Sequence, residues 1–103
     1  MGNVIHTETT TAQVLELVKT NLGISTTVFD AALTNNIELA RSNLSDEGLT
    51  LDESNVPDAM LVVMYSTWLW HERETGAKMP RMLEAAINNK RMHQLMADAV
   101  EWQ

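Results

Sequence analysis

One segment of this chain is apolar on every side of a helix and therefore needs cover all round. Residues 59–65 contain no charged or amide side chain and follow Pro57 and Asp58. Proline lacks the N–H that a first helical turn leaves unpaired, and an acid favours the positive end of the helix dipole. The helix continues through Trp68 and ends where the sequence turns polar at 72–76. We expect it to be central, covered by other helices or by a neighbouring subunit.

Apolar residues that recur every three or four positions predict two helices before the central one. The first is expected over 12–22, with Thr10 and Gln13 at its capped N-terminus and Gly23 as the left-handed residue after its end. The second is expected to take its N-cap from the Ser/Thr cluster 25–27. Its apolar stripe comprises Phe29, Leu33, Ile37, Ala40 and Leu44.

The fold class that follows is all-α: a small bundle of about four helices with a central apolar helix. Residues 45–56 contain four acids and a glycine and are predicted to form an exposed loop, with a short turn at 49–53, between two helical pairs. With 103 residues, the chain is expected to be a single domain. Residues 1–10 are predicted to form a flexible arm and 101–103 a C-terminal tail.

The fourth helix, expected over 80–101, has apolar residues on two opposite sides. At about 100° per residue, Leu83 and Ile87 point away from Met92. One side can meet the chain's own core and the other a neighbouring molecule. The alternative is that Asn88-Asn89 interrupts the helix and that each half buries one face in the same core.

Composition narrows the classes of function. The chain has no cysteine, which excludes disulfides, thiolate zinc sites and cysteine nucleophiles and fits a reducing, cytosolic origin. No signal peptide is recognisable and the longest apolar run is too short to cross a bilayer, so we expect a soluble protein. The net charge of -7 is unevenly distributed along the chain. The residues up to Met60 include nine acids and two bases, whereas those after it include five acids and five bases. This balance argues against sequence-specific nucleic-acid binding, which needs a basic face.

Motifs for catalysis and for metal or cofactor binding are missing from the sequence. The three histidines have no metal-ligand spacing, and His71 lacks the second histidine of a zinc-protease helix. A calcium loop starting at Asn43 would need a bidentate glutamate where Ser54 stands. There is no nucleophile elbow and no glycine-rich phosphate loop. We therefore predict no catalytic residue, no cofactor and no metal, and an enzyme is the least supported class.

Tryptophan and methionine residues are the best candidates for contacts with a partner. Trp68 and Trp70 lie about 200° apart on a helix, which makes it hard for both to face one core. Tryptophan is enriched at interface hot spots, and methionine packs adaptably. The alternative is that a small four-helix core uses all of these side chains. The hypothetical subunit or partner interface comprises Trp68, Trp70, Met79, Met82, Leu83, Ile87, Met92, Met96 and Trp102.

A longer pattern runs through most of the chain: Phe29-Asp30, Leu33, Ile37, Ala40, Leu44, Gly48-Leu49, Pro57, an apolar helix ending Tyr65, Trp68-Leu69 and Arg73, then Met79-Pro80 with Leu83 and Ile87. It resembles the small helical head-tail connector proteins of long-tailed double-stranded DNA bacteriophages, also called adaptors or head completion proteins. The tryptophan-rich third helix departs from the usual pattern. The resemblance implies a virion protein without enzymatic activity, which assembles in the host cytoplasm. It also implies a dodecameric ring beneath the portal protein that extends the DNA channel and receives the stopper or tail completion protein.

The resemblance suggests a role for the acidic residues as well. Acids that line the channel would repel packaged DNA and keep it from adhering as it leaves. The hypothetical channel-facing acids are Glu38, Asp46, Glu47, Asp52 and Glu53. DNA is then a non-specific neighbour, and no membrane is involved. The alternative function is a small cytosolic helical domain that binds or regulates one protein partner.

Overall fold

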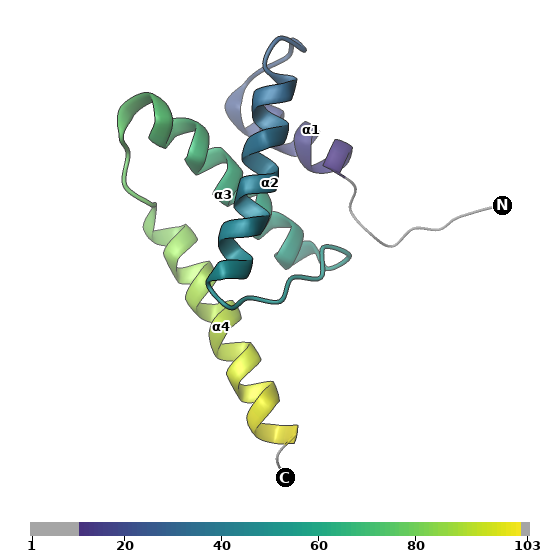
Figure 1. The fold of residues 1–103 in the computed structure, drawn as a ribbon, viewed down its shortest axis with the longest axis vertical. Helices are drawn as coiled ribbons and strands as arrows, with labels where there is room; N and C mark the ends of the chain where they lie inside the picture. The colour runs from purple at the N-terminus through teal and green to yellow at the C-terminus, as the bar shows by residue number, and fades with distance from the viewer. Residues whose placement is uncertain (1–10, 102–103) are drawn as a thin grey trace, which may run out of the picture.

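The computed structural model describes residues 11–101, and only the backbone of 98–101. This part of the chain contains four helices and no strands, which confirms the all-α prediction. The predicted arm at 1–10, with the Thr10 cap, and most of the 101–103 tail lie outside the described residues. The helices are α1 (Thr11–Leu22), α2 (Asp30–Asp46), α3 (Val56–Thr75) and α4 (Arg81–Glu101) (Figure 1).

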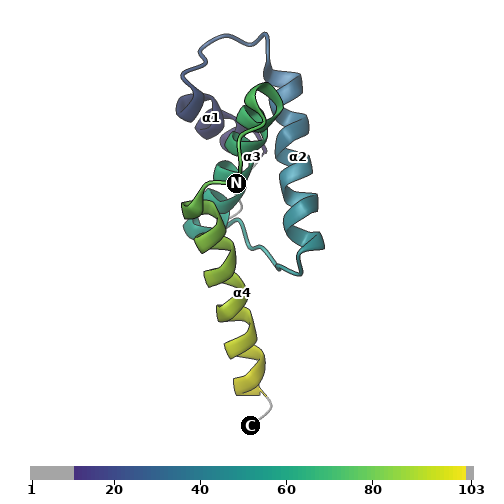
Figure 2. The same cartoon turned by 90° about the vertical axis from the view of Figure 1, so that its left-hand side faces the viewer.

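The apolar helix α3 is central. It contacts all three other helices, whereas α4 contacts only α3 among the described helices. Figure 2 shows α3 between α1 and α2, with α4 running away from the other three. Leu61, Val62 and Val63 point to successive sides of α3 and are all buried, as the sequence predicted, whereas Met60 of the same run is 36% exposed. The remaining buried apolar residues include Val14, Val18, Leu33, Ile37, Ala40, Leu44, Tyr65, Leu83 and Ile87.

The end of α1 agrees with the sequence. The helix stops at Leu22, and Gly23 adopts a left-handed φ of 71° that a side chain would disfavour. The N–H of Ile24 donates to the carbonyl of Lys19 at 2.9 Å, and that of Gly23 donates to the carbonyl of Thr20 at 3.2 Å. These two bonds form a Schellman motif, which satisfies carbonyls that the helix end leaves unpaired.

The start of α2 differs from the prediction. The Ser/Thr cluster 25–27 does not cap the helix: the N-cap residue is Phe29, which makes no side-chain capping bond. A turn, in which the N–H of Asp30 donates to the carbonyl of Thr27 at 3.1 Å, lies between the cluster and the helix start. Asp30 instead stabilises the first turn, because a carboxylate favours the positive end of the dipole. The buried Lys19 lies 2.9 Å from that carboxylate and joins α1 to α2.

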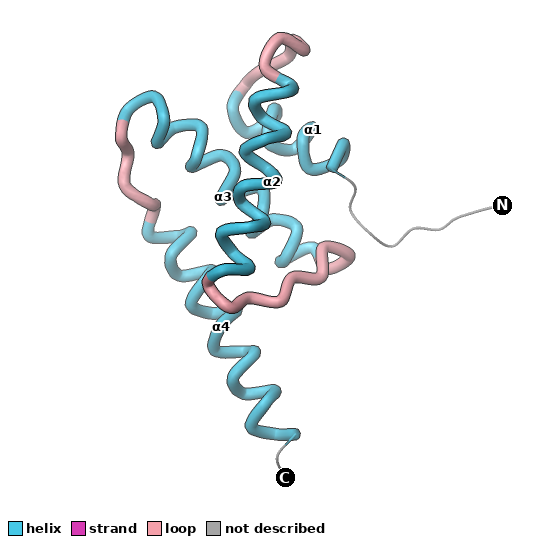
Figure 3. Tube along the Cα trace, in the orientation of Figure 1, coloured by secondary structure: helices cyan, strands magenta, loops and turns pink. Residues whose placement is uncertain are grey.

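The end of α2 lies later than predicted. The helix runs to Asp46, so part of the expected loop is helical (Figure 3). Gly48 is left-handed (φ 88°) and closes a second Schellman motif, in which the N–H of Leu49 donates to the carbonyl of Leu44 at 3.2 Å and that of Gly48 to the carbonyl of Ser45 at 2.9 Å. The buried Leu49 supplies the hydrophobic contact of this motif. Glycine followed by an apolar residue, as at Gly23, was the available sequence signal.

The helix α4 is continuous from Arg81 to Glu101. The alternative that Asn88-Asn89 interrupts it is therefore wrong. Both asparagines are exposed, so their polar side chains need no partner inside the protein. Because the helix does not break, its two apolar sides remain on opposite faces of one rigid rod.

Candidate interaction surface

One side of α4 completes the core. Leu83 and Ile87 are buried in the same cluster as the core residues of α2 and α3, and Ala86 packs against that cluster. Two members of the hypothetical interface are thus covered by their own chain. They hold α4 on α3 and are not exposed to a partner.

The opposite side of α4 is apolar and uncovered. Met82, Met92 and Met96 are 76%, 55% and 60% exposed, and Leu95 is 58% exposed. Ala85 faces the same way and is exposed too. Single exposed apolar residues are common in soluble proteins, whereas a row of them on one helix is typical of an interaction surface. We call these five residues the methionine stripe.

A buried ion pair fastens the middle of α4 to the start of α3. The Lys90 Nζ atom lies 3.0 Å from Oδ2 of Asp58, whose side chain is almost fully buried. The same oxygen accepts the backbone N–H of Asp52 at 2.8 Å. Asp58 also sits in the first turn of α3, where the dipole favours a carboxylate. One side chain therefore joins the loop, α3 and α4.

Two further polar contacts fix α4 to the segment after α2. Arg91 Nη2 donates to Glu47 Oε1 at 2.8 Å. The Gln94 side chain donates to the carbonyl of Gly48 at 3.0 Å and accepts the N–H of Thr50 at 2.7 Å. Both residues of α4 lie 44 or more positions from these partners, so only the folded chain brings them together.

The last part of α4 projects away from the body. Among its described side chains, none after Gln94 makes a hydrogen bond or ion pair with another element. Leu95, Met96 and Ala97 are all exposed. Figures 1 and 2 both show this end of the helix extending beyond the other three helices. Because a short helix gains most of its stability from packing, such an unpacked end is suited to binding another molecule.

The two tryptophans of α3 both have partners within the chain. The Trp68 Nε1–H donates to the carbonyl of Ala77 at 3.0 Å, and its ring packs edge-on against Tyr65 with centroids 5.3 Å apart. Trp70 packs edge-on against Phe29, also at 5.3 Å. The indoles point to different sides, as their spacing requires, and α3 accommodates both because it has neighbours on several sides.

The members of the hypothetical interface thus fall into three groups. Met82, Met92 and Met96 are exposed on the methionine stripe. Trp68, Trp70 and Met79 are partly buried against the core. Leu83 and Ile87 are inside it. Trp102 lies outside the described residues. Leu95 was missed, although its position beside Met92 and Met96 on one turn was readable from the sequence.

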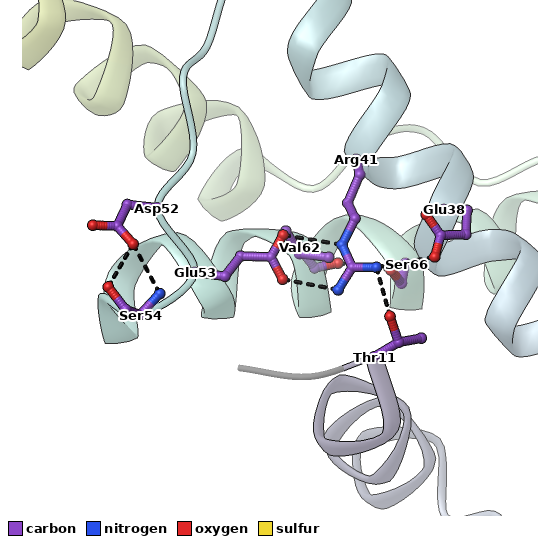
Figure 4. Close-up of polar contacts among 8 residues, drawn as sticks. All are labelled: Thr11, Glu38, Arg41, Asp52, Glu53, Ser54, Val62 and Ser66. Carbon is purple, nitrogen blue, oxygen red and sulfur yellow. Dashed lines mark hydrogen bonds and ion pairs between the residues drawn. The ribbon is translucent and has the colours of Figure 1, made fainter. Parts of the chain in front are cut away.

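Three of the five hypothetical channel-facing acids pair with arginines. Arg41 of α2 donates two hydrogen bonds to Glu53 from one edge of its guanidinium group, Nε to Oε2 at 3.0 Å and Nη2 to Oε1 at 2.9 Å. Its Nη1 reaches Glu38 at 3.1 Å and the hydroxyl of Thr11 at 2.9 Å. Figure 4 shows the guanidinium between these groups. The hydrogen bonds to Glu53 are the largest cause of a raised pKa at Arg41. Glu47 is the acid bound by Arg91.

The other two acids of the set are exposed. Asp46 lies in the last turn of α2. Asp52 accepts both the backbone N–H and the hydroxyl of Ser54, and these bonds lower the pKa of the Asp52 carboxyl. Because folding lowers that pKa, the bonds stabilise the protein at pH values above the ordinary pKa of an aspartate. This stabilisation is lost as the pH falls through the lowered pKa of Asp52 in the folded protein. The short turn that the sequence predicted at 49–53 lies at 52–55 instead.

Substitution of Arg41 by methionine is expected to lower the free energy of unfolding by about 2 kcal/mol. The change removes both bonds to the largely buried Glu53 and leaves its carboxylate without that partner. Urea unfolding followed by tryptophan fluorescence measures the effect. The matched control is Lys78→Met, which changes an exposed base and should cost about 0.5 kcal/mol or less. Equal losses in the two variants would contradict the role given to Arg41.

Two hollows flank the contact between α3 and α4. One, of about 500 Å³, surrounds the Lys90–Asp58 pair, whose charges neutralise each other. The other, of about 350 Å³, lies where the end of α3 meets the start of α4 and is mainly apolar. We call the second one the groove. It is lined by Met64, Thr67, Trp68, Ala77, Pro80 and Leu83, with Asn21, His71, Lys78 and Met82 at the same site.

No catalytic arrangement accompanies these hollows in the part of the chain that is described. Over this part, no group of three His, Asp or Glu side chains could hold a metal ion. Asn43, where the calcium loop would begin, is inside α2. His71 and His93 are exposed, and His6 lies outside the described residues. None of the described helices is long and apolar enough to cross a membrane.

Comparisons with known proteins identify no relative. No family model matches this chain. No curated protein and no solved structure is significantly similar to it. A functional proposal therefore has to start from the surfaces described above and from the sequence pattern.

Proposed function

We propose that this chain is a structural virion protein, a subunit of the head-tail connector ring of a long-tailed double-stranded DNA bacteriophage. In this role it docks beneath the portal and extends the DNA channel toward the stopper or tail. The observation that carries the proposal is the two-sided helix α4, which buries Leu83 and Ile87 in the core and leaves the methionine stripe exposed. Each subunit of a ring contacts its two neighbours through two different surfaces. The methionine stripe is an apolar surface of α4 that the chain's own core does not use and that can serve as one of them.

The overall arrangement supports the same proposal. The sequence pattern that resembles connector proteins includes Pro57, Leu83 and Ile87, and these residues begin α3 and join α4 to the core. The exposed end of α4 extends past the other helices, where a portal or a second subunit can reach it. A small cytosolic domain with a single partner would use the same stripe, so the test has to separate the two functions.

Fractionation of a lysate from the source cells or an induced prophage provides that test. We expect the chain to comigrate with DNA-filled heads at a fixed ratio to portal protein, as measured by mass spectrometry of sedimentation fractions. A Met92→Glu/Met96→Glu variant should be lost from the particles, because charges on the stripe oppose apolar contact. The matched control is Val28→Glu, since Val28 is 78% exposed and lies outside α4. Absence of the chain from every particle would favour the cytosolic function.

We also propose that acids on α2 face the channel and repel DNA. Glu38 and Asp46 are the informative pair, because Asp46 is exposed and the contact of Glu38 with Arg41 lies at the surface, whereas Glu47 and Glu53 connect separate segments of the fold. Glu38→Gln/Asp46→Asn is expected to raise the affinity of assembled rings for duplex DNA and to slow DNA exit. Fluorescence polarisation with labelled duplex and an ejection assay measure the two effects. Unchanged behaviour in both assays would show that these acids do not face DNA.

A further inference from the structure

The groove is a preformed apolar site. Its wall is fixed because the Trp68 indole donates to the carbonyl of Ala77 and packs against Tyr65. Pro80 restricts the backbone on the other side, and Leu83 is locked in the core. A site with a volume of about 350 Å³ can take one or two large apolar side chains without rearranging.

The projecting end of α4 has the shape and chemistry to fill such a site. Met92, Leu95 and Met96 are adjacent on consecutive turns and each is more than half exposed. Methionine adapts its shape to an irregular pocket and makes favourable contacts with aromatic rings such as that of Trp68. Burial of three such side chains would stabilise a complex, because the removal of apolar surface from water is favourable.

A single copy cannot bring these two surfaces together. The groove lies at the start of α4 and includes Leu83, whereas Met96 lies thirteen positions further along the same unbroken helix. At about 1.5 Å per residue, roughly 20 Å of rigid helix separates them. The projecting end must therefore find its groove on another molecule.

Charge indicates that this molecule is a second copy. The sequence of α4 has Asp98 and Glu101 near its C-terminal end and no base in its last turn. Acids are unfavourable at that end of a helix, because the dipole is negative there. The groove carries Lys78, and Arg81 begins α4 beside it. Glu84 lies in the same first turn of α4, but no acid among the described residues lines the groove itself, so a second copy presents Lys78 to the projecting end.

We propose that the segment 92–96 of α4 in one copy binds the groove of a second copy, with the C-terminal end of this helix near the partner's bases. The contact is heterologous, since it joins two different surfaces, so each copy has a free groove and a free helix end for further copies. Such contacts close into a ring when the rotation between copies allows it. This inference deepens the proposed connector function and relies on it only for ring closure.

Engineered disulfides test the contact directly, because the chain has no cysteine of its own. Thr67 lies in the groove, and Thr67→Cys/Met96→Cys should give a ladder of covalent oligomers when the purified full chain is oxidised. The matched control, Ser42→Cys/Met96→Cys, replaces the groove cysteine by one on the exposed face of α2. Copies with Thr67→Cys alone, mixed with copies with Met96→Cys alone, should form mixed dimers. A ladder no stronger than in the control would overturn the proposal.

Sedimentation of the full chain without engineered cysteines gives an independent measurement. Met96→Asp is expected to weaken self-association about tenfold or more, whereas Val28→Asp should leave it unchanged. Lys78→Glu should also weaken it, because an acid would then lie near the negative end of the partner's helix dipole. Self-association that none of these changes affects would overturn the proposed contact.

The two proposals fail in different ways. Mixed dimers from a chain that is absent from phage particles would support the contact between copies and reject the connector function. A chain that comigrates with heads at a fixed ratio to portal, but gives no specific ladder, would support the connector function and reject this contact.

Discussion

Leu33→Ala is expected to lower the free energy of unfolding by about 3 kcal/mol. Leu33 is completely buried in α2, and α2 packs against both α1 and α3. Removal of three aliphatic carbons from such a site loses apolar contact and leaves a cavity that the surrounding helices fill only partly. For a domain of this size, the loss corresponds to a fall in Tm of about 15 °C.

The same helix offers a matched control for this substitution. Leu39 is 47% exposed on the outer side of α2, so Leu39→Ala should cost about 0.5 kcal/mol or less. Urea titration of both variants, with equal m values, gives the comparison. A larger loss from Leu39→Ala than from Leu33→Ala would mean that α2 turns its other side toward the core.

Asp58→Ala is expected to cost about 3 kcal/mol, the second largest effect. The substitution leaves the Lys90 ammonium and the N–H of Asp52 without their shared acceptor. It also removes the acid from the first turn of α3. The fold then loses one of the connections between α4 and the loop, so protection of the α4 amides from hydrogen exchange should fall as well.

A double-mutant cycle separates the ion pair from the rest of this effect. Lys90→Met combined with Asp58→Ala should cost less than the sum of the two single changes, because the second change no longer breaks an existing pair. Glu47→Ala serves as the comparison for a more exposed pair, since Glu47 and Arg91 are both over a third exposed, and should cost about 0.5 kcal/mol. Additive losses at Asp58 and Lys90 would show that the two charges do not interact.

Local patterns were sufficient to predict which parts of the chain are helical. Pro57 and the apolar run after it identified α3, and Gly23 marked the end of α1. The two-sided pattern of α4 also separated the buried Leu83 and Ile87 from the exposed Met92. Periodicity and capping depend on residues within a few positions of each other, so the sequence reports them directly.

The same local rules failed where several signals competed. The Ser/Thr cluster 25–27 looked like a cap, but the helix starts later, at Asp30, beside the buried Lys19. The acids around Gly48 suggested a loop, yet α2 continues to Asp46 because a Schellman motif ends it there. At 25–27 a contact with another helix accompanies the later start, whereas at Gly48 a local C-terminal motif outweighed the acidic composition.

The sequence by itself determined the helices, the central position of α3 and the opposed sides of α4. Only the tertiary structure decided that Asn88-Asn89 stays helical, that Trp68 and Trp70 both find partners in the chain, and that Arg41 and Arg91 neutralise Glu53 and Glu47. It also created the groove, whose walls come from α3, the start of α4, the segment between them and Asn21 of α1. Helix formation follows from neighbouring residues, whereas ion pairs and hollows depend on the relative positions of segments that are far apart in the chain.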